Sequence, residues 1–115
     1  MKYLCLAYEA EDVTDTMSPE QWSALRQETY EYMASLRESG HLLDTQTLQR
    51  AGTGVLVRVR NNDLITSDGP FIETREQIGG FLMIEAEDFN EALRIASRLP
   101  SARLGTIEVR PIEMR

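Results

Sequence analysis

The stretch that decides the fold of this chain reads Ser67-Asp68-Gly69-Pro70-Phe71-Ile72-Glu73-Thr74-Arg75-Glu76-Gln77-Ile78-Gly79-Gly80-Phe81. It begins with a tight turn, because Asp-Gly-Pro favours turns, and it ends where an apolar strand starts. Asp68 has two interpretations. Its carboxylate caps the turn by accepting a backbone N–H, with Gly69 in a conformation closed to other residues, or it lies at a pocket rim as a base or hydrogen-bond acceptor. The charged segment between turn and strand is expected to be solvated, with local ion pairs; alternatively Glu73 or Arg75 reaches a ligand.

A hairpin is predicted directly before this stretch. Val55, Val57 and Val59 alternate with Leu56 and two arginines, which is typical of a half-buried strand. Residues 61–63 follow as a turn of residue types that tolerate positive φ, and residues 64–66 return as the partner strand.

The N-terminal part predicts a strand over residues 2–8, an acidic loop over 9–16 and a long helix. The helix should begin at Ser18-Pro19-Glu20-Gln21, where Ser18 and Gln21 can form a capping box and Pro19 suits the first turn. Its apolar stripe runs from Trp22 to Leu36, and Gly40 marks its end.

The C-terminal part predicts another strand over 80–84, a helix capped by Asp88 or Asn90 and closed by Pro100, and a last strand over 106–110. The order is β-α-β, a β-hairpin, then β-α-β. The fold class is therefore α+β: a ferredoxin-like two-layer sandwich with an extra β-hairpin, in a single domain over residues 1–115.

Alternation along the strands predicts that the two sheet faces differ. The face toward the helices is expected to carry Val55, Val57, Val59, Ile107 and Val109. The opposite face is expected to mix apolar and charged groups: Tyr3, Cys5, Ala7 and Leu56 beside Arg58, Arg60, Glu108 and Arg110. Because bare apolar surface is costly, a second subunit is expected to cover this face, which predicts a homodimer with an enclosed pocket.

Composition narrows the class of protein. The formal net charge of -7 argues against partners such as nucleic acids and anionic membranes, which require clustered basic residues. The single cysteine, Cys5, lies in an apolar run and is expected to be a buried thiol rather than a reactive one. Without a signal-peptide pattern or an apolar stretch of membrane-spanning length, a cytoplasmic protein is expected.

The chain also resembles a known family. The block from Asp68-Gly69-Pro70-Phe71 through Glu76-Gln77-Ile78-Gly79-Gly80-Phe81, the segment Glu108-Val109-Arg110-Pro111-Ile112 and the opening Met1-Lys2-Tyr3-Leu4 resemble the DGPF-domain branch of the YCII-related family. The resemblance implies a dimeric α+β barrel, in which two ferredoxin-like subunits pack sheet against sheet. It also implies a link to sigma-factor-associated signalling, since members are often encoded near such factors.

A histidine–aspartate pair, with the histidine on the first helix, has been suggested for the wider family. This chain departs from that pattern, because residues 19–39 contain no histidine and its one histidine, His41, follows Gly40. At a helix end a histidine is more often a cap than a catalyst. Two hypotheses therefore stay open: a dimeric small-molecule-binding or regulatory module, or a cofactor-independent enzyme that uses acid–base chemistry on a small organic substrate.

The candidate ligand-binding residues are Tyr8, Arg58, Arg60, Asp68, Phe71 and Glu108. The arginines and Glu108 form either ion pairs or an arginine-lined cavity, because guanidinium groups bind carboxylates and phosphates in bidentate fashion. A small anionic guest is expected, held without metal or cofactor, since no metal-site spacing is present.

Overall fold

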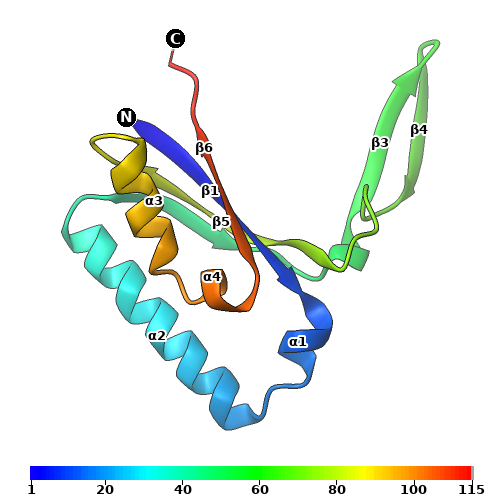
Figure 1. Ribbon diagram of the computed structural model, residues 1–115. Coiled ribbons are helices and arrows are strands. Elements are labelled where there is room, and N and C mark those ends of the chain that lie inside the picture. Colours follow the sequence, from blue (N-terminus) through cyan, green and yellow to red (C-terminus); the bar gives the residue numbers. More distant parts are fainter. Residues whose placement is uncertain (115) are drawn as a thin grey trace.

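A computed structural model describes residues 1–114 (Figure 1). The strands are β1 (Lys2–Ala10), β2 (Leu42–Thr47), β3 (Val55–Arg60), β4 (Asp63–Asp68), β5 (Glu76–Glu85) and β6 (Thr106–Pro111). The helices are α1 (Glu11–Asp15), α2 (Pro19–Glu38), α3 (Phe89–Ser97) and α4 (Ser101–Leu104), with a short 3₁₀ turn at Ala51–Thr53. No helix in this described range is long and apolar enough to cross a membrane.

The main sheet is antiparallel, with strand order β2-β5-β1-β6. Helices α2 and α3 cover one of its faces, and the core lies between these two layers (Figure 1). This arrangement confirms the α+β, ferredoxin-like prediction. The pairing of β1 with β5 shifts register between Ala7 and Tyr8, where Gly79 of β5 is left without a partner, so β5 is bulged opposite this end of β1.

Local sequence signals explain the ends of the helices. The Ser18 hydroxyl accepts from the Gln21 amide and the Gln21 side chain accepts from the Ser18 amide, which is the predicted capping box. Gly40, at φ +83°, ends the same helix. Of the two candidate caps for α3, the structure selects Asp88, whose carboxylate accepts from the Glu91 amide at 2.8 Å.

The acidic segment after β1 differs from the prediction of a loop. Glu9 and Ala10 extend the strand, and Glu11–Asp15 forms the short helix α1. Two acidic residues in its first turn complement the helix dipole, and the Thr14 hydroxyl donates to the Glu11 carbonyl at 2.9 Å.

The assignment of the faces of β1 was wrong. Tyr3, Cys5 and Ala7 point toward the helices and are buried in the core, where Cys5 pairs with Leu82 of β5. Leu4, Leu6 and Tyr8 therefore lie on the helix-free face. Ile107 and Val109 pack against the core, as predicted.

The hairpin has the predicted turn, but its strands do not lie against the helices as predicted. Asn61 and Asn62 have φ values of 52° and 66°, which suits the tight turn. Strands β3 and β4 pair only with each other and project from the rest of the molecule (Figure 1). Val55, Val57 and Val59 are about 60% exposed and do not face the helices.

The helix-free face of the main sheet carries both apolar and charged side chains. Leu4 pairs with Met83, and Leu6 pairs with Phe81; all four side chains are only half-buried. Glu108 and Arg110 of β6 lie beside them in register. The predicted mixed character of this face is thus present, with Leu4, Leu6, Phe81 and Met83 in place of Tyr3, Cys5, Ala7 and Leu56.

Candidate functional site

Tyr8 and Glu108, two of the predicted site residues, are in direct contact. The Tyr8 hydroxyl, near the end of β1, donates to Glu108 Oε1 at 3.2 Å across the β1–β6 pair. Arg110, two residues further along β6, donates through Nε to Glu108 Oε2 at 3.1 Å. These three side chains form one hydrogen-bonded row on the helix-free face.

The electrostatics of this row fix its protonation states. The hydrogen bond from Arg110 holds the pKa of the Glu108 carboxyl below its ordinary value. Desolvation, followed by the contact with Glu108, raises the pKa of the Tyr8 phenol. Near neutral pH the phenol is therefore a neutral donor and the carboxylate an ionised acceptor.

Tyr8 and Phe71 line a common cavity of about 600 Å³, where the segment after the hairpin passes the end of the main sheet. The lining is largely apolar and includes Leu48, Ile72 and Ile78. Gln77 is one of its polar residues; its side-chain amide donates to the carbonyls of Ile72 at 2.7 Å and Thr74 at 3.0 Å. This amide fixes the segment that carries Phe71.

The remaining three predicted residues lie on or at the end of the hairpin. The Arg58 guanidinium stacks over the Phe71 ring, 5.5 Å from its centroid. Arg60 lies at the hairpin tip and donates to the carbonyl of Val59 at 3.0 Å. Asp68 ends β4, opposite Val55. Because β3 and β4 form a sheet of their own, Arg58 and Arg60 do not share a sheet face with Glu108, and that inference from alternation was wrong.

The turn after Asp68 is closed by the backbone. The Gly69 amide donates to the Gly54 carbonyl at 2.8 Å, which ties the end of β4 to the start of β3. Positive φ is not the reason for the glycine, contrary to the expectation. A Cβ on Gly69 would lie 3.0 Å from the Gly54 carbonyl oxygen, so close backbone approach requires glycine here.

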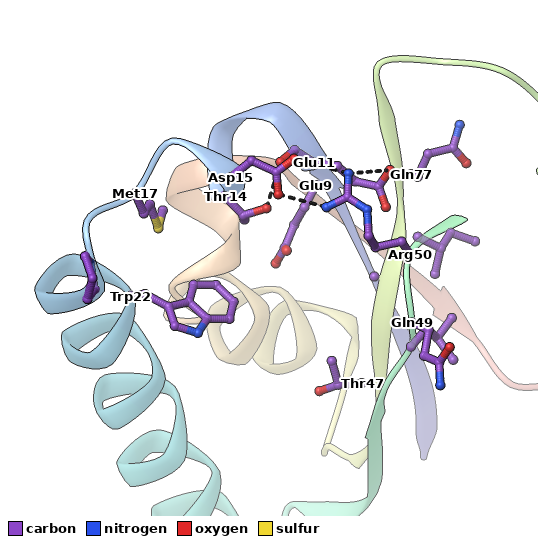
Figure 2. A pocket seen from close by; sticks show the side chains of 14 residues that line it. Glu9, Glu11, Thr14, Asp15, Met17, Trp22, Thr47, Gln49, Arg50 and Gln77 are labelled. Carbon is purple, nitrogen blue, oxygen red and sulfur yellow. Dashed lines mark hydrogen bonds and ion pairs between the residues drawn. The ribbon is translucent and has the colours of Figure 1, made fainter. Parts of the chain in front are cut away.

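A second cavity, of about 640 Å³, adjoins the first and shares Leu48, Arg50 and Gln77 with it (Figure 2). Arg50 forms one wall. It holds the Asp15 carboxylate with two hydrogen bonds of 2.8 and 3.1 Å, which lower the pKa of Asp15. Glu11 accepts from the Ala51 amide at 3.0 Å, so α1 is fastened to the segment after β2.

Sequence reasoning missed several residues of these cavities. Arg50 was not predicted to be a site residue, and Gln77 was expected to lie in a solvated segment. The signal for Gln77 was its place two residues before the paired glycines Gly79 and Gly80, because glycines inside a strand often mark a close approach.

His41 lies at the helix end, as its position in the sequence indicated. Its Nδ1 is 2.9 Å from the Glu85 carbonyl and 3.9 Å from Glu91 Oε1. Across residues 1–114, no group of three or more His, Cys, Asp or Glu side chains is arranged to hold a metal ion.

The chain is similar to a known family and to a bacterial protein. The sequence model of the YCII-related domain matches residues 1–114. An uncharacterised protein of Rhizobium meliloti (strain 1021), R00369, is 32% identical over 116 residues, which span 99% of this chain and 94% of that protein.

Proposed function

The chain belongs to the YCII-related family, and on that premise we propose that it is a dimeric module that binds a small organic anion with an apolar body. The observation that carries this proposal is the cavity of about 600 Å³ between Tyr8 and Phe71. Its size and its largely apolar lining surface are typical of small-molecule sites.

The cavity lining includes both the Arg50 guanidinium and the Glu76 carboxylate, and the nearby Arg58 supports an anionic guest. Arg58 lies against Phe71, a lining residue, and has no carboxylate within 4 Å among residues 1–114. A guanidinium without an ionic partner is free to bind a carboxylate or phosphate. Arg50, by contrast, is already neutralised by Asp15.

The row of Tyr8, Glu108 and Arg110 favours binding over catalysis. A general acid or base works best when its pKa is close to the working pH. Here the pKa of Glu108 is lowered and that of Tyr8 is raised, so both shifts move away from neutrality. The acid–base enzyme remains the alternative, but this pair of shifts does not favour it.

The helix-free face supports the dimeric part of the proposal. Leu4, Leu6, Phe81 and Met83 are only partly buried there, and a second copy packed sheet against sheet would remove them from water. Glu108 and Arg110 pair within one subunit, so they add no unpaired charge to such an interface. The assignment to the DGPF branch and the link to sigma-factor-associated signalling belong to the same proposal, since a ligand-binding dimer suits a regulatory role.

The test uses 8-anilinonaphthalene-1-sulfonate, an aromatic anion whose fluorescence rises in apolar sites. We expect saturable binding to the full chain. Arg58→Gln should weaken it by about five- to tenfold, because the variant loses one charge-assisted contact. Arg37→Gln, which removes an exposed arginine from α2, is the control and should bind like the wild type. Equal affinities of all three proteins would contradict the proposed site.

A further inference from the structure

We propose that the cleft between the N-terminal half of α2 and the main sheet is a second, separate binding site. It takes a protonated amine on an aromatic or other apolar body. The Glu9 carboxylate is the counter-ion, and Trp22 packs against the body of the ligand.

The cleft exists because only one end of α2 is packed. Met33 and Leu36, both in its C-terminal half, are the buried residues of this helix. Trp22, near its start, remains 44% exposed although it lies on the predicted apolar stripe. Between this unpacked half and the sheet lies a cavity of about 630 Å³ that Trp22 and Leu25 line from the helix.

Small residues of the sheet keep the floor of the cleft open. Ala7, Gly79 and Gly80 line it from β1 and β5, at positions where larger side chains would fill the space below the helix. A Cβ on Gly80 would lie 2.9 Å from the carbonyl oxygen of Gln46, so the approach of β2 restricts this position to glycine. Glycine inside a strand gives up packing, and it marks places where another group comes close to the backbone.

Glu9 supplies the charge. Its Oε1 accepts from the Ser101 hydroxyl at 2.6 Å, which orients the carboxylate, while Oε2 lies over Gly79. Glu9 lines this cleft and also the adjoining cavity of Figure 2, where Trp22 reaches in from α2.

The ion pairing of Glu9 sets it apart from its acidic neighbours. Glu11 and Asp15 share Arg50, and Glu28 is paired with Arg103. No basic group within residues 1–114 comes within 4 Å of the Glu9 carboxylate. A half-buried carboxylate without a cation is under-compensated, and a ligand ammonium group would supply the missing charge.

The apolar part of the ligand is indicated by the rest of the lining. An indole beside a cation site attracts the cation through its ring face and also packs against flat apolar groups. Leu25 and Met33 extend this apolar wall. Arg26 also lines the cleft and is exposed, so an anion attracted by Arg26 is the competing outcome that the experiment must separate.

The experiment uses phenethylamine as the amine probe and 3-phenylpropionate as its anionic counterpart with a similar body. Trp22 is the single tryptophan of the chain, so its fluorescence reports on the cleft directly. We expect a saturable change with phenethylamine and affinity at least tenfold weaker for 3-phenylpropionate. Comparable or tighter binding of the anion would overturn the proposal.

Two variants test the roles of the Glu9 charge and of the glycine floor of the cleft. Glu9→Gln should weaken phenethylamine binding at least tenfold, whereas Glu31→Gln, the same change at an exposed position of α2, should have no effect. Gly79→Ala keeps the Glu9 charge but adds a methyl group to the floor of the cleft. The new Cβ would lie 3.6 Å from Glu9, which is an ordinary contact, so the chain should fold. Binding of phenethylamine should weaken, because the methyl group takes up part of the cleft. Unchanged affinity in folded Glu9→Gln or Gly79→Ala would overturn the proposal.

This site is independent of the proposed anion site. Arg58→Gln should leave phenethylamine binding as it is in the wild type, and Glu9→Gln should leave the binding of the anilinonaphthalene probe unchanged. The two proposals can therefore fail separately. An effect of Arg58→Gln on the amine as large as that of Glu9→Gln would refute a separate site.

Discussion

At the scale of single residues, the buried thiol of Cys5 makes the stability of the protein depend on pH. Its side chain is fully buried, and burial raises the pKa of the thiol from the ordinary 9.0 to about 11. The unfolded chain therefore loses this proton at lower pH than the folded chain. This contribution to stability is complete below the unfolded pKa and is lost as pH rises toward the folded pKa.

The free energy of unfolding should show this loss against a variant that lacks the thiol. From about pH 8 to about pH 10, the stability of the wild type relative to Cys5→Ala should fall by about 1 kcal/mol. Urea denaturation at each pH measures the difference. The cavity left by Cys5→Ala costs the same at both pH values, so parallel pH profiles would show that the thiol is not held protonated.

At the scale of elements, the hairpin depends on one close backbone contact. Gly69→Ala would place a Cβ 3.0 Å from the Gly54 carbonyl oxygen, against backbone that cannot rotate away. We expect a loss of about 1–2 kcal/mol in the free energy of unfolding, as for other overpacked sites. Gly52→Ala is the matched control, because nothing lies within 4 Å of its added Cβ. Equal denaturation midpoints for the two variants would contradict this assignment.

Elements marked by strong local sequence motifs could be predicted, but their position in the fold could not. The capping box at Ser18 and the turn at Asn61–Asn62 depend on contacts within a few residues, so sequence alone located them. The alternation from Val55 to Arg60 is the same for a strand of the main sheet and for an independent hairpin, because alternation does not encode the partner strand. The helix α1 was missed because its stabilising contacts to Arg50 and Ala51 come from distant sequence.

The candidate sites were predictable in part, for the same reason. Tyr8 and Glu108 could be grouped because both lie on strands of the main sheet, and they do meet. Arg60 could not be placed, since the hairpin carries it away from that sheet. Glu9 was not predicted as a site residue, because its surroundings, Ser101 and Gly79, come from distant parts of the chain.

At the scale of the whole molecule, the composition of the two sheet faces bears on assembly. The helix-covered face holds the fully buried residues, among them Tyr3, Cys5 and Ile84. The opposite face has apolar side chains that no element within residues 1–114 covers, although Leu4 and Leu6 are as apolar as core residues. In a single copy, these partly buried side chains contribute less hydrophobic stabilisation than they would if they were fully buried.

A charge on this face should therefore separate the proposed dimer without unfolding the subunit. Leu4→Glu places a carboxylate beside Arg110 in register, which one copy tolerates in water, but a sheet-to-sheet interface would bury it at high cost. Sedimentation equilibrium should give about twice 13.1 kDa for the wild type and 13.1 kDa for the variant. Leu93→Glu, the same change on the exposed side of α3, should stay dimeric. A wild-type mass of 13.1 kDa at every concentration, or a dimeric Leu4→Glu, would show that this face is not the interface.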